Sequence, residues 1–184
     1  MTTAAQKLIT AEEFARMPQP EDGSQQELIR GVIVTMPPPK GPYGACCFNI
    51  AFCLGGFVKA NGLGVIFCND TGFVTEHDPD TIRGADVAFW SRERLPAVPD
   101  GYLPIAPDLA IEVVSPDDHF VRIQRKVAHY LTHGVRLLWV LDPDDRSLTV
   151  YRPDQPLRIL GEADTVSGED VLPGFSCRVS ELFP

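Results

Sequence analysis

The sequence has no long hydrophobic run and no segment with the layout of a signal peptide. Its longest strongly apolar stretch, residues 45–58, is interrupted by one asparagine and two glycines and is shorter than the ~20 residues that cross a bilayer. The N-terminus lacks the charged and then apolar order of a secretory signal. We therefore expect a cytoplasmic protein without a membrane segment.

Basic charge is also scarce. The chain has 16 Lys and Arg against 25 Asp and Glu, a net charge of −9. This balance disfavours a protein that coats nucleic acid through bulk charge, because such binding depends on Lys and Arg neutralising phosphates. It still allows an enzyme that contacts DNA through a small basic patch beside an acidic metal site.

Paired cysteines are absent as well. The five cysteines form an odd set without C-x-x-C spacing, so reduced thiols on buried apolar faces are a better interpretation than zinc ligands. The chain of 184 residues also lacks internal repeats and low-complexity tracts. Its length and composition predict one globular domain over residues 1–184.

Turn and capping signals divide the first half of the chain into short elements. Thr10 and Glu13 form a capping box, which predicts a helix that ends near Met17. Two β-rich runs within residues 27–36 flank Arg30-Gly31 and predict a hairpin. The apolar residues of 43–60 have a helical period and a wide apolar face, which indicates a buried helix. Short strands are expected at 65–68, 72–76 and 86–90.

The centre of the chain predicts a strand, a helix and a second strand. Residues 108–114 and 135–141 are strongly apolar, and the segment between them begins a helix near Asp117-Asp118 that ends at Gly134. This order implies a parallel strand pair with a right-handed crossover. Strands at 148–151 and 157–160 and a helical turn at 179–183 should follow. The predicted fold is α/β (α+β), with a central mixed β-sheet flanked by helices and additional β-hairpins.

Two carboxylates fall within apolar strands. Alternation places Glu112 on one face of its strand and its apolar neighbours Ile111 and Val113 on the other. Asp86 begins another apolar strand. A buried carboxylate must be paired or bound to a metal, so two of them on adjacent strands predict a site for Mg²⁺, which prefers carboxylate ligands. The alternative is a glutamate in a salt bridge at the sheet surface.

The central helix carries a cationic face. Arg122, Lys126, His129 and His133 are spaced four, three and four apart, which places them on one side of the helix. Beside them lies a predicted apolar stripe: Phe120, Ile123, Val127, Tyr130 and Leu131. On spacing alone a solvated face is the better interpretation, although a cation near two carboxylates is what phosphodiester hydrolysis requires. We expect the two histidines at the surface or the rim of the site and not as metal ligands.

Several motifs together resemble those of the Uma-two family of restriction endonucleases. The family lies in the PD-(D/E)xK nuclease superfamily, so the resemblance implies a restriction-endonuclease-like core. The matching segments cover nearly the whole chain from Glu27 to Phe183: Glu27-Leu28-Ile29-Arg30-Gly31, Gly84-Ala85-Asp86-Val87-Ala88, Pro107-Asp108-Leu109-Ala110-Ile111-Glu112-Val113-Val114-Ser115-Pro116, Lys126-Val127-Ala128-His129-Tyr130, Gly134-Val135, Leu138-Trp139-Val140-Leu141-Asp142-Pro143 and Leu172-Pro173-Gly174-Phe175.

The resemblance implies roles for individual residues. Asp86, Glu112 and the backbone carbonyl of Val113 correspond to metal ligands, and Glu27 corresponds to an additional acidic residue at the edge of the site. Val114 stands where the superfamily has its catalytic lysine, and Lys126 on the following helix fits the displaced position. Tyr130 and Arg122 are candidate substrate contacts.

Two positions depart from the family pattern. Ala85 replaces the proline that usually precedes the aspartate, and Tyr43-Gly44-Ala45 stands where relatives often have a histidine. The expected activity is Mg²⁺-dependent hydrolysis of DNA phosphodiester bonds, with Mn²⁺ able to substitute. A homodimer is expected because cutting both strands is easiest with two sites. Two alternatives stay open: a catalytically weak or inactive binding or regulatory module, and a structural dimerisation module.

Overall fold

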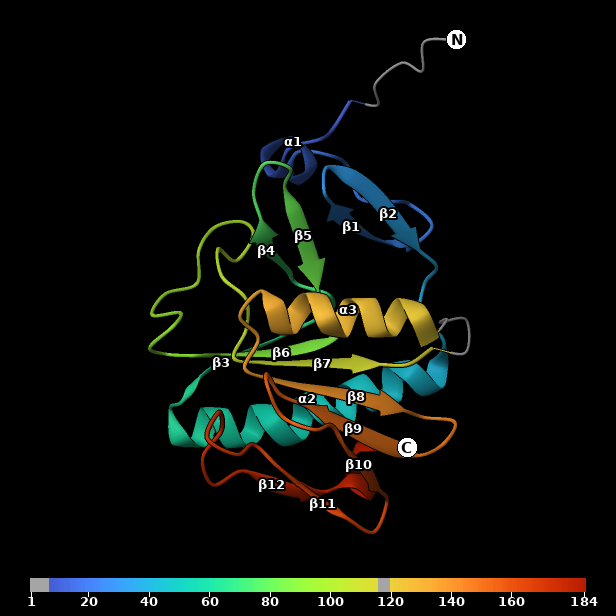
Figure 1. The fold of residues 1–184 in the computed structure, drawn as a ribbon, viewed down its shortest axis with the longest axis vertical. Helices are drawn as coiled ribbons and strands as arrows, with labels where there is room; N and C mark the ends of the chain where they lie inside the picture. The colour runs from blue at the N-terminus through green and yellow to red at the C-terminus, as the bar shows by residue number, and fades with distance from the viewer. Residues whose placement is uncertain (1–6, 116–119) are drawn as a thin grey trace.

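The computed structural model describes residues 7–115 and 120–184 and has a six-stranded sheet at its centre (Figure 1). The order is β10-β9-β8-β7-β6-β3. β7 and β8 are parallel, and all other neighbouring pairs are antiparallel. The predicted central mixed sheet and its parallel pair are therefore confirmed. The strands are β3 (Gly64–Cys68), β6 (Val87–Ser91), β7 (Leu109–Val113), β8 (Leu137–Asp142), β9 (Ser147–Tyr151) and β10 (Arg158–Gly161).

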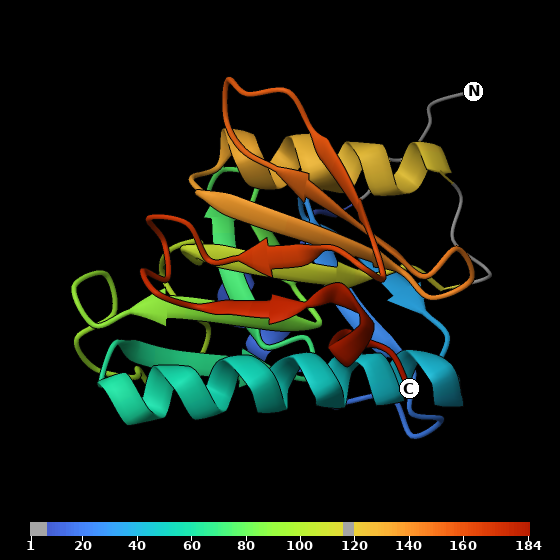
Figure 2. The same cartoon turned by 90° about the horizontal axis from the view of Figure 1, so that it is seen from below.

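One long helix covers each face of this sheet (Figure 2). On one side, α2 (Gly41–Asn61) buries Cys46, Ile50, Leu54 and Val58 in a core shared with Leu109, Ile111 and Val113. On the other side, α3 (Phe120–Thr132) buries Val127 and Tyr130 beside Ala110. The strand β7 therefore alternates as predicted, and Glu112 lies on the face that α3 covers.

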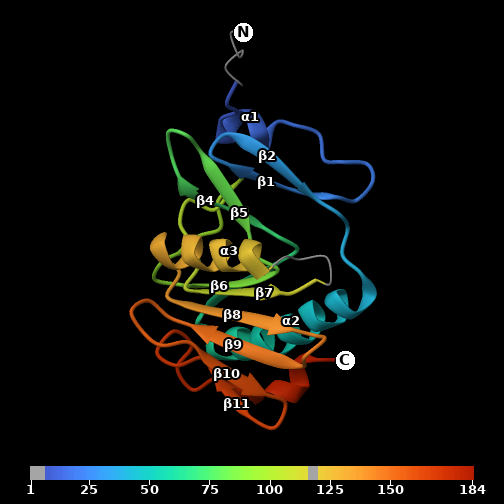
Figure 3. The same cartoon turned by 45° about the vertical axis from the view of Figure 1, so that its right-hand side comes forward.

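A second sheet lies beyond α3, in the upper part of Figures 1 and 3. Its four strands have the order β2-β1-β5-β4. The predicted hairpin joins β1 (Gln25–Ile29) to β2 (Val32–Met36) through Arg30 and Gly31, both of which have a positive φ. The other two strands are β4 (Gly72–Glu76) and β5 (Thr81–Gly84). The helix α1 (Ala11–Ala15) begins with the predicted capping box and packs Phe14 against this sheet.

Several elements differ from the prediction. The strand β5 and the two three-residue strands β11 (Thr165–Ser167) and β12 (Ser176–Arg178) were not predicted, because such short strands show little alternation. A 3₁₀-helix, η1 (Val179–Leu182), closes the chain as expected. The predicted start of the central helix near Asp117-Asp118 lies outside the described residues.

Two predictions about side-chain burial were wrong. Phe120 was assigned to the apolar stripe of α3, but 73% of it is exposed because the contact of α3 with the core begins one turn later, at Ile123. The cysteines are free thiols, yet only Cys46 is fully buried and Cys68 is exposed.

The helix α2 is longer than the sequence analysis expected. It extends over 21 residues, and by length and composition alone it is long and apolar enough to cross a membrane. Pro42 starts it in the first turn, where a missing N–H costs no hydrogen bond, and Gly62 ends it in the left-handed conformation. Here the helix lies along the sheet, with one side in the core and Phe48 and Phe52 exposed on the other.

Candidate active site

The pairing of β6 with β7 places the two predicted carboxylates side by side. Val87 pairs with Ile111, so Asp86 continues the same antiparallel register opposite Glu112. The backbone N–H of Val113 donates a hydrogen bond of 2.6 Å to Asp86. The side chains therefore come from adjacent central strands, at the end of the sheet where β6 begins.

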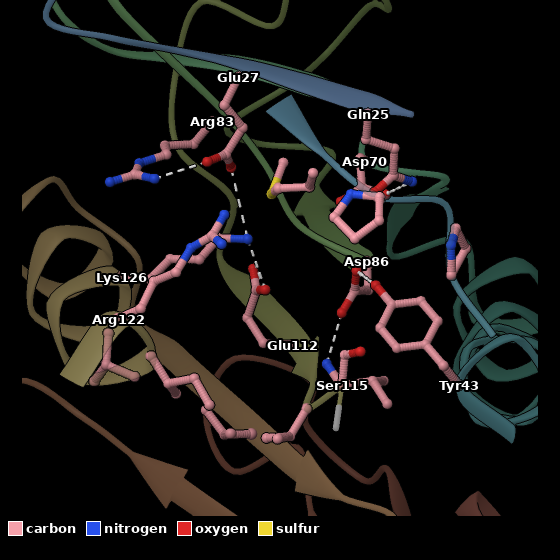
Figure 4. Close-up of a pocket in the computed structure, with 18 of the residues that line it drawn as sticks. Gln25, Glu27, Tyr43, Asp70, Arg83, Asp86, Glu112, Ser115, Arg122 and Lys126 are labelled. Atoms are coloured by element: carbon pink, nitrogen blue, oxygen red, sulfur yellow. Dashed lines mark hydrogen bonds and ion pairs between the residues drawn. The ribbon is translucent and has the colours of Figure 1, made fainter. Parts of the chain in front are cut away.

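Lys126 extends from α3 toward the strand face that carries Glu112 (Figure 4). Its ammonium donates to Glu112 Oε2 over 2.7 Å and lies 3.6 Å from Glu27 Oε1. The Lys126 side chain is 18% exposed and that of Glu112 14% exposed. The lysine therefore points from the helix to the proposed ligand Glu112, and the ion pair is largely removed from solvent.

Glu27 lies deeper than the resemblance implies. It was placed at the edge of the site, but its side chain is only 4% exposed. Arg83 donates to Glu27 Oε2 over 2.7 Å, and the backbone N–H of Gly84 donates to Oε1 over 3.1 Å. Glu27 is therefore fixed from the side of the second sheet and helps to hold Lys126 in place.

Two site residues were missed by the sequence analysis. Asp70, in the turn between β3 and β4, lies against Asp86 and accepts a hydrogen bond from Gln25. Tyr43, in the first turn of α2, donates its hydroxyl hydrogen to Asp86. Asp in a turn is too common to stand out. Tyr43 was noted only as a departure from the family pattern.

The buried carboxylates repel one another. Burial raises the pKa of Asp86 well above its usual range, and the neighbouring Glu112 and Asp70 raise it further. Burial raises the pKa of Glu112 to about 7, although Lys126 opposes this shift. Burial also raises the pKa of Asp70. These shifts have the pattern of a site with too little positive charge for its carboxylates.

Neighbouring charges outweigh burial in the ionisation of Lys126 and Glu27. Burial disfavours ionisation of Lys126, but the adjacent Glu112 carboxylate, with Glu27 and Asp86, holds its pKa well above the usual value. Burial also opposes ionisation of Glu27, yet Lys126 and Arg83 lower its pKa. The carboxylates of Glu27, Asp70, Asp86 and Glu112 thus lie around two largely buried basic side chains, Lys126 and Arg83.

A cavity of about 360 Å³ connects this network to solvent. Glu27, Asp70, Asp86 and Glu112 line it together with residues 113–115. Its rim is basic and exposed, and carries the following side chains: Lys40, Arg122 and Arg125. Exposed basic side chains, among them the predicted substrate contact Arg122, therefore lie at the mouth of an acidic cavity, an arrangement that the net negative charge did not exclude.

Tyr130 does not line the cavity, which argues against the predicted substrate contact. Its side chain is fully buried, and its hydroxyl donates to the carbonyl of Gly84 over 2.8 Å. Lys126 lies 5.7 Å from the centre of the Tyr130 ring. Tyr130 is thus a positioning residue that joins α3 to the segment that carries Asp86.

The donor set fits a divalent cation. Glu112 Oε1 is buried and has no hydrogen-bond partner, a costly state for a carboxylate oxygen. Mg²⁺ prefers oxygen ligands of this kind. No three of these carboxylates offer oxygens within 4.8 Å of one another in the described part of the chain. Glu112 faces Lys126 and Asp86 faces Tyr43. Repulsion between the carboxylates of Asp86 and Glu112 favours these separate orientations, and a cation bound between them would remove that repulsion.

The fold and site define a class: a mixed sheet that brings two acidic residues from adjacent strands to a helix-borne lysine beneath a basic rim. Comparison with known proteins agrees with this class. The chain belongs to the Uma2 family, described as "Putative restriction endonuclease", whose family model matches residues 11–180.

A solved structure has the same fold. The "Crystal structure of a putative nuclease belonging to DUF820 from Anabaena variabilis ATCC 29413" is 26% identical to this chain, with a TM-score of 0.81. The similarity covers 95% of this chain and 97% of that one. No curated protein matches the chain. The predicted family and nuclease-like fold are thereby confirmed.

Proposed function

We propose that this protein is an endonuclease that hydrolyses DNA phosphodiester bonds and depends on Mg²⁺, which Mn²⁺ can replace. The observation that carries the proposal is the unpartnered, buried Glu112 Oε1 beside Asp86, with Lys126 on the other oxygen of the same carboxylate. Family membership supports a nuclease, and the solved structure of similar fold is described as one.

Asp86, Glu112 and the backbone carbonyl of Val113 would hold the cation, and the newly found Asp70 adds negative charge beside them. The chemistry supplied at such a site is activation of a water molecule and neutralisation of charge on the scissile phosphate. Tyr43 and the N–H of Val113 orient the Asp86 carboxylate by hydrogen bonds to its two oxygens.

Lys126 is the residue to which we assign stabilisation of the transition state. Its ammonium would orient the attacking water or stabilise charge on the phosphate, and a fixed cation in a site shielded from solvent is effective in this role. Glu27 and Arg83 keep Lys126 in position, because Arg83 holds Glu27 within 3.6 Å of the ammonium. At the rim, Arg122 and Arg125 would bind phosphates of the flanking DNA backbone.

A plasmid-nicking assay tests the proposal. The purified protein should nick supercoiled DNA with Mn²⁺ or Mg²⁺ and not with EDTA. Asp86→Asn should abolish cleavage through loss of a metal ligand. Lys126→Ala should lower the rate on the order of a hundredfold or more without weakening metal binding, because lysine is not a ligand and its loss leaves more negative charge beside the cation.

The control for Lys126 must lie away from the cavity. Arg125 is the neighbour of Lys126 on α3, but it lines the same cavity and is unsuitable. Lys59 is an exposed lysine in the last turn of α2, and Lys59→Ala should cut at the wild-type rate. Equal rates for Lys126→Ala and wild type would refute the assignment. A protein that binds Mn²⁺ through Asp86 but never nicks DNA would instead be a binding or regulatory module.

A further inference from the structure

A second cluster of potential metal ligands joins α3 to the β4 strand. Glu76, at the end of β4, lies next to His129 of α3 and His133, which directly follows α3, and one potential ligand atom from each lies within 4.8 Å of the others. All three side chains are half-buried, and none of them lines the cavity that holds Asp86 and Glu112. Figures 1 and 3 both show α3 running beside β4 and β5.

The hydrogen bonds of His133 leave one ring nitrogen available. Its Nδ1 lies 2.7 Å from the backbone carbonyl of His129, and a carbonyl oxygen can only accept. Nδ1 therefore carries the hydrogen, and in the neutral ring Nε2 carries a lone pair. That nitrogen lies 3.5 Å from Glu76 Oε1. A lone pair facing a carboxylate oxygen is repulsive unless a proton or a metal cation lies between them.

Hydrogen bonds also orient the side chains of Glu76 and His129. Glu76 Oε2 accepts a hydrogen bond of 2.7 Å from the buried Thr81 hydroxyl, which leaves Oε1 directed toward His133. His129 Nε2 lies 2.9 Å from the Thr75 hydroxyl, and its ring stacks on that of His133 with centroids 4.1 Å apart. Metal-binding histidines and carboxylates commonly have such supporting partners on the atoms that do not bind the ion.

We propose that Glu76, His129 and His133 form a second metal site that binds a transition-metal ion of the Zn²⁺ class. Two imidazoles and one carboxylate suit Zn²⁺ or Co²⁺ better than Mg²⁺, which prefers an all-oxygen shell. Neighbouring ligands of a tetrahedral Zn²⁺ are about 3.3 Å apart, given bonds of about 2 Å, so only a small closure of the three side chains is needed. A water molecule would complete the shell.

A metal ion at this site would connect α3, which carries Lys126, to the β4 strand. His129 lies one turn beyond Lys126, and Glu76 belongs to the strand paired with β5, which leads to Asp86. A bound ion would hold α3 against the second sheet and so fix the lysine relative to the carboxylates. Sequence spacing showed the two histidines, which were expected at the surface or the rim of the site and not as metal ligands, so the proposal reverses the last part of that expectation. Only the tertiary structure adds the third ligand, Glu76.

Metal titration of the full-length Asp86→Asn protein tests the proposal apart from the carboxylate site. After EDTA treatment and dialysis, Zn²⁺ at a hundredfold excess over its dissociation constant should raise the melting temperature by about 5–10 °C. Co²⁺ should give visible d–d absorption bands without thiolate charge-transfer bands, which separates this site from the free cysteines. Mg²⁺ should have neither effect.

Further substitutions in the same background identify the ligands. His133→Ala and Glu76→Gln should each abolish the Zn²⁺ shift, and Gln keeps a hydrogen-bond acceptor for Thr81. His77, an exposed histidine of the neighbouring β4–β5 turn, is the control, and His77→Ala should keep the full shift. If His133→Ala has a lower melting temperature than Asp86→Asn in EDTA, the substitution has disturbed the fold, and the Zn²⁺ shift of Glu76→Gln is then the deciding measurement. A shift that persists in Glu76→Gln, or one accompanied by thiolate bands, would overturn the proposal.

Discussion

Replacing Glu112 by glutamine should stabilise the metal-free protein while removing its proposed function. Glutamine keeps the size of the side chain and an acceptor for Lys126, but it removes a carboxylate whose oxygen Oε1 is buried without a partner. Burial raises the pKa of this group from 4.5 to about 7. At about 1.4 kcal/mol per pKa unit, the ionised form costs about 3 kcal/mol of folding stability at pH 8.

The sign of the effect sets its pH dependence. Because the pKa of Glu112 is higher in the folded state, that state binds more protons between pH 4.5 and about 7. The wild-type protein therefore loses stability relative to Glu112→Gln as the pH rises through this window. The difference in the free energy of unfolding should be about 3 kcal/mol at pH 8 and below about 1 kcal/mol at pH 5.

Urea unfolding in EDTA, followed by the fluorescence of the buried Trp90 and Trp139, measures this difference at both pH values. Adding Mn²⁺ at a hundredfold excess over its dissociation constant should stabilise wild type by about 2.7 kcal/mol and leave Glu112→Gln unchanged. Glu93→Gln alters an exposed carboxylate outside the cavity and should show the same stability as wild type at both pH values. The reasoning fails if Glu112→Gln is less stable than wild type at pH 8, or if the difference does not change with pH.

Three further outcomes are expected. Arg122→Ala should weaken DNA binding and reduce the slope of log K against log salt by up to about 0.9, with little change in the cleavage rate at saturating DNA. Fluorescence anisotropy at several salt concentrations measures this slope. An unchanged slope would show that Arg122 does not contact DNA. Tyr130→Phe removes the hydroxyl that donates to the carbonyl of Gly84, so chemical denaturation should show that the free energy of unfolding falls by about 1–3 kcal/mol. Because Tyr130 positions other groups and does not contact the substrate, KM for DNA should not change. Sedimentation equilibrium should find a dimer, and a monomer that cuts both strands at once would contradict that expectation.

Local patterns were sufficient for most of the architecture. The alternation in β7 determined that Glu112 lies on the face opposite Ile111, and the apolar period of α3 placed Val127 and Tyr130 in the core. These predictions succeed because the side chain's direction within a strand or helix follows from the backbone repeat. The same patterns failed at short strands and at Phe120, the first residue of α3, because the contact of this helix with the core begins one turn later, at Ile123.

Strand and helix patterns supplied the candidate residues Asp86, Glu112 and Lys126, and the resemblance to a family supplied their roles, but neither could show how these residues are held. Asp70 reaches the site through contacts with Gln25, 45 residues earlier in the chain, and with Asp86. Glu27 is joined to Gly84 across 57 residues.

The sequence by itself therefore determined the family, the order of the central elements, and the faces of β7 and α3 on which Glu112 and Lys126 lie. The tertiary structure alone decided the partners: Arg83 behind Glu27, Tyr43 on Asp86, and Glu76 beside a histidine pair. The reason is physical. A backbone repeat fixes the direction of a side chain, whereas its distance to a charge on another element, and hence its pKa and its ligands, depends on how the sheets and helices pack.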